Sequence, residues 1–437
     1  MKHRLSHEDK HQLLQSAPRV PHRALALGGG GPAVGISIGF LRALDVWNQQ
    51  MDDKPANHHR KIDFPVWVAG CVGAWLSCLY HLGEGDDKGH QVGKEMRKFF
   101  RPEAEYDLFP CPTTFTPDLP ELLASSLKFM LDPASYKNLV VPQSIIRAHH
   151  DLFDFYLRPS RWNPGDFANL MLNSVFAPNP ASRLIMGLQY KAPLTGLNKL
   201  WFGPEYSVLQ QYELSRLSEL KTQLYFNSYN LSQHQQDIYS NHPGQTLPEG
   251  RFTQAITMPA LCAASALPYV MQPLDLQGQL HMEGAVIDSF CLENVQDLHP
   301  ELNEIWISRI VDHKQVQPPR HLLDALNNLI MLYAGTTSLN DVRRFADRHH
   351  QEEVLYALHE AQQGRSGHQP HWIEVIELPV WSGAQYYWTH ENFDACIQAS
   401  EQACMQSLRD YDARITRNRQ GQALRAPLAR HIVRNTA

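Results

Sequence analysis

The residues around Cys71 form the pattern in this sequence best suited to covalent chemistry. The segment VAGCVGA (residues 68–74) follows an apolar run and leads into apolar residues at helical spacing. Small residues on both sides of Cys71 allow a sharp turn between strand and helix, the arrangement of a nucleophile elbow. Backbone N–H groups at a helix N-terminus favour an anion, so we expect the pKa of the thiol to be lowered and the thiolate to be available. The alternative interpretation is that Cys71 is a small, inert core residue.

A run of four glycines provides a second site for chemistry. Gly28 to Gly31 lie between an apolar strand and a helix, where backbone N–H groups could bind an anion or stabilise an oxyanion. Gly28, Gly30 and Ala33 also fit the G-x-G-x-x-A form of a dinucleotide-binding loop. However, no acidic residue closes a second strand about 20 residues later. A P-loop is excluded because no Gly-Lys-Ser/Thr follows.

Four segments taken together resemble the patatin-like phospholipase family. That family has a G-G-G-x-R/K-G oxyanion loop, a G-x-S-x-G elbow, an Ala-Ser-x-Ala-x-Pro segment and an Asp-Gly-Gly/Ala segment, in this order. The corresponding segments of this chain read LGGGGPAVG, AGCVG, CAASALPYVMQP (residues 262–273) and MEGAVID (residues 282–288). The resemblance covers residues 20–90 and 215–310 and implies a three-layer α/β/α fold with a mostly parallel central sheet and a helical insertion.

The resemblance also implies a set of site residues. Cys71 stands where the family has its nucleophilic serine, and Glu283 where it has the dyad aspartate. Gly29, Gly30 and Gly31 match the oxyanion loop, but Ala33 replaces its basic residue. A thiolate needs less help from a base than a serine hydroxyl, so cysteine with glutamate is a coherent double change. The expected activity is hydrolysis or transfer of a fatty acyl group through an acyl-thioester, on an ester, thioester or amide.

Three alternatives remain open. The base could be Asp288 or His281, which lie in the same segment as Glu283. The scaffold could have lost catalysis and bind an acyl chain or a protein partner without turnover. Finally, His149, His150 and Asp154 fit the H-H-x-x-x-D pattern of carrier-protein-dependent acyltransferases.

The charge balance and the arrangement of polar residues argue against a nucleic-acid-binding protein and against a metal site. Its 437 residues include 39 Lys and Arg against 45 Asp and Glu, and this net charge of −6 argues against a nucleic-acid partner. The sequence shows no spaced set of zinc ligands and no carboxylate cluster for calcium, so no metal or other cofactor is expected. Candidate partners are a fatty acyl lipid or acyl-thioester substrate, an acyl carrier protein, and a membrane surface contacted peripherally.

Three windows without Asp, Glu, Lys or Arg raise the question of membrane insertion. They are residues 24–41, 64–83 and 252–274. Glycine and proline interrupt them, whereas a lipid-exposed span needs an unbroken helix, so we assign them to a buried core. The polar first residues and seven cysteines without CxxC pairs favour a reduced, cytoplasmic setting.

Alternating strand and helix patterns predict the elements that position these residues. We expect a patatin-like core over residues 18–310, with a helical insertion or lid at about 85–215. A helical extension over residues 311–437 should pack on this core. Strands are predicted at residues 23–27, 62–69, 222–230, 280–287, 304–310 and 372–378. Helices are predicted at residues 36–47, 74–82, 322–334, 339–359 and 393–414.

Overall fold

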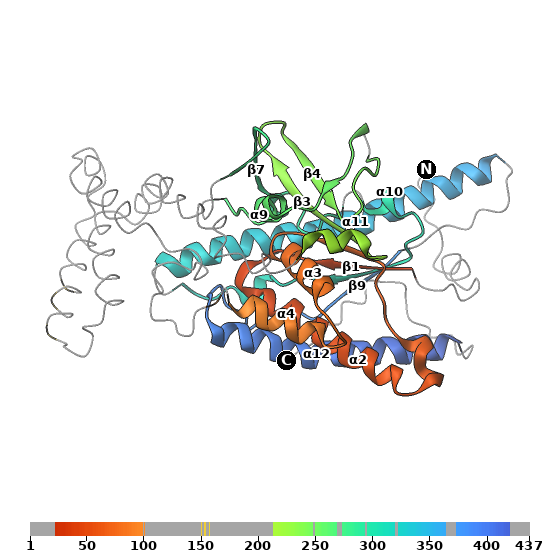
Figure 1. Cartoon of the computed structure of the whole chain (residues 1–437), viewed down its shortest axis with the longest axis horizontal. Helices are drawn as coiled ribbons and strands as arrows, with labels where there is room; N and C mark the ends of the chain where they lie inside the picture. The colour runs from red at the N-terminus through yellow and green to blue at the C-terminus, as the bar shows by residue number, and fades with distance from the viewer. Residues whose placement is uncertain are drawn as a thin grey trace.

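The computed structural model describes residues 22–98, 100, 213–247, 250–268, 273–292, 295–319, 322–363 and 373–419, with the single residues His150, Phe153 and Leu157. Within these ranges the chain forms a mixed nine-stranded sheet with helices on both faces (Figure 1). The predicted three-layer α/β/α fold is therefore confirmed.

The sheet is mostly parallel at its centre. Its main path runs β5-β4-β3-β2-β1-β8-β9, and β7 pairs with β3 and with β6. Strands β2, β1, β8 and β9 are parallel to their neighbours, whereas β3 pairs antiparallel with β4 and β7. The bounds are β1 (Arg23–Leu27), β2 (Val66–Ala69), β3 (Gln223–Asn230), β4 (Gln235–Ser240), β5 (Gln254–Ala255), β6 (Leu274–Leu276), β7 (Gln279–Glu283), β8 (Glu304–Ser308) and β9 (Glu374–Glu377).

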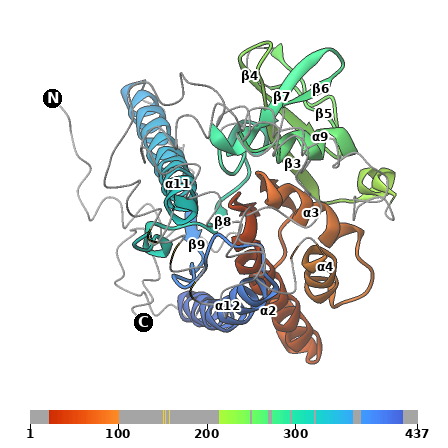
Figure 2. The same cartoon turned by 90° about the vertical axis from the view of Figure 1, so that its left-hand side faces the viewer.

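Alternate residues of the central strands build two separate cores, as the two-residue period of a strand requires. Leu25, Leu27 and Trp306 face the helices α2, α3, α4, α9 and α12. Ala24 and Ile305 face the opposite layer, formed by α10 and α11. Figure 2 shows α11 and the α2–α12 pair on opposite sides of β8 and β9. The helices are α2 (Gly35–Asp52), α3 (Val72–Leu82), α4 (Lys88–Arg97), α9 (Met258–Ala264), α10 (Val295–Leu298), α11 (Leu322–Gln362) and α12 (His390–Arg419).

The segment after residue 310 contributes to the central architecture. β9 extends the sheet beside β8, and α12 lies along α2, where the Ser400 hydroxyl donates to the Ile36 carbonyl at 2.7 Å. Short 3-10 turns complete the described chain at η1 (Gly31–Val34), η2 (Pro55–Arg60), η7 (Leu214–Glu219), η9 (Gly284–Val286) and η10 (His313–Gln315). The segment after residue 310 is therefore part of the same sheet and helix layer as β1 and α2.

Four predicted elements were wrong in extent. The strand predicted at 62–69 begins only at Val66, after Pro65, which has no N–H to donate to a sheet. The strand predicted at 280–287 ends at Glu283, where the chain turns into η9. The two helices predicted at 322–334 and 339–359 are one continuous helix, α11. Its central residues 335–338 (GTTS) are weak helix formers, but Thr337 and Ser338 donate their hydroxyls to carbonyls of the preceding turn.

Most of the insertion predicted at residues 85–215 lies outside the described residues. Its first part, α4, packs on α2 and α3 and belongs to the core. The Asp45 carboxylate accepts the N–H of Gly89 at 2.6 Å and the hydroxyl of Tyr80 at 2.5 Å. These bonds hold the start of α4 against α2.

In the described part of the chain, no helix combines the length and the apolar character that crossing a bilayer requires. The uncharged windows at residues 24–41 and 64–83 instead supply strands and helices of the buried core, as the sequence predicted.

Candidate active site

Cys71 occupies the sharp turn between β2 and α3 that the sequence predicted. Its backbone has φ 51° and ψ −126°, a strained conformation for a residue other than glycine. The glycines on either side are needed because the backbone passes close to other segments. A Cβ at Gly70 would lie 2.3 Å from the Ser289 carbonyl oxygen, and one at Gly73 would lie 2.5 Å from that of Leu27. The turn thus directs the thiol into a pocket at the start of α3, as a nucleophile elbow does.

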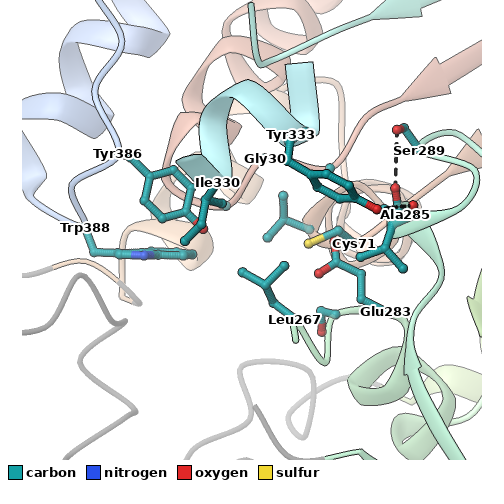
Figure 3. A pocket seen from close by; sticks show the side chains of 16 residues that line it. Gly30, Cys71, Leu267, Glu283, Ala285, Ser289, Ile330, Tyr333, Tyr386 and Trp388 are labelled. Carbon is teal, nitrogen blue, oxygen red and sulfur yellow. Dashed lines mark hydrogen bonds between the residues drawn. The ribbon is translucent and has the colours of Figure 1, made fainter. Parts of the chain in front are cut away.

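Glu283 ends β7 directly beside Cys71. The Cys71 thiol and the Glu283 carboxyl group lie side by side in the same pocket, and a Cβ at Gly29 would lie 2.8 Å from Cys71 Cβ and 3.4 Å from Glu283 Oε1. Figure 3 shows the two groups pointing toward one another at one side of a pocket. The backbone of Glu283 is fixed by its N–H bond to the Ala266 carbonyl at 3.0 Å and by its pairing with Ser228 of β3. The segment that follows α9 therefore positions the carboxylate.

The glycine loop brings its backbone to the same sulfur atom. The N–H groups of Gly30 and Val72 lie close enough to the Cys71 thiol to favour its charged form, and Gly29 lies against its side chain. Gly29, Gly30 and Gly31 all line the pocket. Val72 was missed in the sequence, although the residue after an elbow nucleophile commonly supplies an oxyanion donor. Two backbone donors from separate elements thus converge on the predicted nucleophile.

The electrostatics of the pair differ from the sequence prediction. Burial and the adjacent Glu283 carboxylate raise the pKa of the Cys71 thiol well above its usual value. The predicted lowering of this pKa is wrong, because these two effects outweigh the backbone donors of Val72 and Gly30. Burial also raises the pKa of Glu283 to about 7. At rest the sulfur is a neutral thiol, so it needs a base to become nucleophilic.

One oxygen of Glu283 has no partner among the described residues. Its Oε2 is buried and has no hydrogen-bond partner within the described ranges, and only 4% of the residue is exposed. An ionised carboxylate in this position is poorly solvated, which is the physical cause of its raised pKa.

The pocket beside the pair is largely apolar and encloses about 810 Å³, counting its open mouth. Cys71 and Glu283 lie on one side of it, and Ile330, Tyr386 and Trp388 lie on the other (Figure 3). The remaining described lining residues are Gly29, Gly30, Gly31, Val72, Ser265, Leu267, Ala285, Val286, Ser289, Tyr333 and Ala334. Sequence reasoning missed the wall from α11 and from residues 386–388, because no motif marks those segments.

The alternative bases lie in other hydrogen-bond networks. Asp288 accepts the N–H groups of Phe290 and Leu292 at 3.2 and 3.1 Å, and so closes a turn. His281 is buried and bonded to Asp237 at 2.8 Å. Neither residue is among the described residues that line the pocket. The structure thus places both away from the cavity that Cys71 and Glu283 share.

The described residues do not test the H-H-x-x-x-D alternative. Of its three motif residues only His150 is described, and it is exposed; His149 and Asp154 lie outside the described residues. Among the residues that the structure describes, no group of three or more His, Cys, Asp or Glu side chains could hold a metal ion.

Comparison with known families agrees with this geometry. The family model described as patatin-like phospholipase matches residues 25–295, more than half of the chain. The chain belongs to the patatin-like phospholipase family. No curated protein matches its sequence. Membership in the patatin-like family indicates lipid acyl hydrolase activity and a lipid substrate. Residues 311–437, which include the far wall of the pocket, lie outside the matched segment.

Proposed function

We propose that this chain is a lipid acyl hydrolase or acyltransferase that works through a dyad of Cys71 and Glu283. The observation that carries the proposal is the placement of the Cys71 thiol beside the buried Glu283 carboxyl group, whose pKa is about 7, in one pocket. A base with a pKa near neutrality can both take and return a proton. The apolar pocket beside the pair suits the hydrocarbon part of a fatty acyl substrate.

In the acylation step, the Glu283 carboxylate takes the proton of the Cys71 thiol while Sγ attacks the acyl carbonyl carbon. The carbonyl oxygen becomes an oxyanion, and we assign its stabilisation to the N–H groups of Gly30 and Val72, which lie beside the sulfur. Such a donor is worth roughly 3 to 4 kcal/mol in the transition state. The intermediate then expels the leaving alcohol, thiol or amine, which takes the proton from Glu283.

In the deacylation step, Glu283 removes a proton from water or from another acceptor nucleophile, which attacks the thioester carbonyl. Collapse of this second intermediate releases the fatty acid or the transferred acyl product and returns the proton to Cys71. Hydrolysis and transfer differ only in the nucleophile that reaches the acyl-enzyme.

Intact-protein mass spectrometry tests the proposal. The purified chain is incubated with a fatty acyl p-nitrophenyl ester, a fatty acyl-CoA thioester and a phospholipid, in parallel with Cys71→Ala, Cys71→Ser and Glu283→Gln. We expect a hydroxylamine-sensitive acyl adduct on Cys71 in the wild type. Cys71→Ala should remove both adduct and turnover, and Glu283→Gln should slow acylation by about 100-fold or more.

Cys404→Ala is the matched control, because Cys404 is a fully buried thiol on α12 away from the pocket. It should leave the adduct and the turnover unchanged. An adduct that persists in Cys71→Ala, or turnover that survives Glu283→Gln unchanged, would overturn the dyad. Wild-type binding of the acyl compounds without adduct or turnover would identify the chain as a non-catalytic lipid-binding member.

A further inference from the structure

We propose that Trp388 forms the end wall of the acyl-binding pocket and sets the longest acyl chain that the site accepts. This inference rests on the proposed function, because it assigns the pocket beside Cys71 to the acyl chain. Trp388 lies in the segment between β9 and α12, far from the family motifs in sequence.

The indole closes the side of the pocket opposite the reacting groups. In Figure 3, Cys71 and Glu283 face the pocket from one side, and Trp388 faces it from the other. The indole also reaches the glycine loop, since a Cβ at Gly31 would lie 3.2 Å from its Cζ2 and 3.3 Å from the Tyr386 hydroxyl oxygen. An acyl chain that starts at the sulfur and extends across the pocket therefore meets the indole.

The walls between these two ends are apolar. Leu267 lies on one side of the path and Ile330 of α11 on another (Figure 3), and Ala334 of α11 also lines the pocket. Each methylene that an acyl chain buries along such walls contributes about 0.8 kcal/mol, or roughly a fourfold gain in affinity. The gain should continue until the chain end reaches the indole and should then stop.

Two aromatic side chains, Phe100 and Phe393, hold Trp388 in place. Its ring packs against Phe100 with centroids 5.0 Å apart, and Phe100 packs against Phe393 of α12 at 4.4 Å. Phe100 and Phe393 are both buried, with 2% and 0% of their surface exposed. Moving the indole aside would break this aromatic stack, so it acts as a fixed wall.

The end wall lies outside the part of the chain that the family pattern covers. Trp388 and Ile330 both follow residues 25–295, the segment that matches the patatin-like family. The catalytic motifs therefore do not determine where the pocket ends; the segment after residue 311 does.

Two measurements test the proposal. The first is calorimetric binding of a homologous series of straight-chain methyl ketones, which carry the carbonyl but no leaving group. In the wild type, affinity should rise roughly fourfold per methylene up to a break and then level off. In Trp388→Ala the break should move to longer ketones by about two carbons or more, the room left by the indole. The second measurement is kcat/KM for p-nitrophenyl esters of the same chain lengths, whose optimum should move in the same direction.

Trp381→Ala is the matched control, because Trp381 belongs to the same segment and packs on the core but is not among the described lining residues. It should leave the break where it is. Trp388→Phe, which keeps an aromatic ring on Phe100, should give a smaller shift and remains informative if the alanine variant does not fold.

The outcomes separate this inference from the proposed function. An unchanged break in folded Trp388→Ala and Trp388→Phe would overturn the end wall, even if esters are hydrolysed. A shifted break in binding, with no turnover by the wild type, would uphold the end wall and reject the proposed reaction.

Discussion

The side chain of Asn227 lies against the backbone of Gly284, the residue that follows Glu283. A Cβ at Gly284 would lie 2.5 Å from Asn227 Oδ1. Asn227 also donates its Nδ2 to the carbonyl of Asp288 at 2.9 Å. It therefore holds the turn after β7 at both of its ends, and this turn fixes the direction in which Glu283 leaves the strand.

Gly284→Ala should show whether the turn positions the Glu283 carboxylate, separately from its effect on stability. The added methyl group must displace Asn227 or the turn, which should cost about 1 to 3 kcal/mol of unfolding free energy. Because a displacement of about 1 Å can cost 100-fold in rate, kcat/KM should fall by about tenfold or more in the protein that remains folded. Gly335→Ala is the control: its Cβ would lie 3.4 Å from His313, an ordinary contact, and it should keep full activity. Wild-type kcat/KM in folded Gly284→Ala would show that the turn does not position the carboxylate.

The activity of the proposed dyad should rise with pH through the pKa of Glu283. Below about pH 7 the buried carboxyl group is protonated and cannot take the proton of Cys71; above it, the carboxylate can. The kcat/KM for a short-chain ester should therefore increase about tenfold per pH unit on the acidic limb and level off above about 7. The measurement is a pH–rate profile from well below to well above this value.

Glu283→Gln removes the group to which the acidic limb is assigned. Its residual rate should no longer level off near pH 7, since only direct ionisation of a thiol with a raised pKa remains. A profile that keeps the same limb in Glu283→Gln would assign the titration to another residue.

The motifs could be located from sequence because each one is local. The elbow requires small residues next to Cys71, and the structure shows which carbonyls of Ser289 and Leu27 impose them. Glu283 could be paired with Cys71 only through the family pattern, since 212 residues separate them and β3 brings β7 to the same edge.

Other features depend on long-range packing that no local pattern encodes. Burial and the neighbouring Glu283 raise the pKa of Cys71 more than the helix start lowers it. Trp388 comes to the pocket because α12 docks along α2, and Ile330 because α11 packs against η9, the turn after Glu283. A short apolar stretch has the same pattern whether it lines a cavity or fills a core, so the far wall could not be predicted.

Tyr333 of α11 is hydrogen-bonded to η9, the turn that follows Glu283. Its hydroxyl donates to the Val286 carbonyl at 2.6 Å, and about half of the residue is exposed. Tyr333→Phe keeps the ring in the pocket wall but removes this bond, so stability should fall by no more than about 1 kcal/mol. The kcat/KM should fall by roughly three- to tenfold if the bond positions Glu283, as the steady-state rate and the melting temperature together would show. A loss of stability with no change in rate would restrict Tyr333 to a packing role.

The buried carboxyl group should also make the protein less stable as pH rises. The pKa of Glu283 is about 7 in the folded chain, against 4.5 for an unperturbed glutamate, so over this window the folded state retains its proton and the unfolded state does not. The stabilising difference is fully present below about pH 4.5 and is lost as pH rises through about 7. At about 1.36 kcal/mol per pKa unit, the loss amounts to about 3 kcal/mol.

The side chain in Glu283→Gln is uncharged at every pH in this range. The free energy of unfolding of this variant should therefore not fall by that amount as pH rises. It should unfold at a higher temperature than the wild type at about pH 8, and the advantage should disappear near pH 4.5. Thermal unfolding of both proteins across this range measures the difference, and Glu219→Gln on the exposed surface provides the carboxylate control. Equal pH dependence in the wild type and Glu283→Gln would mean that the carboxylate is better solvated than its burial implies.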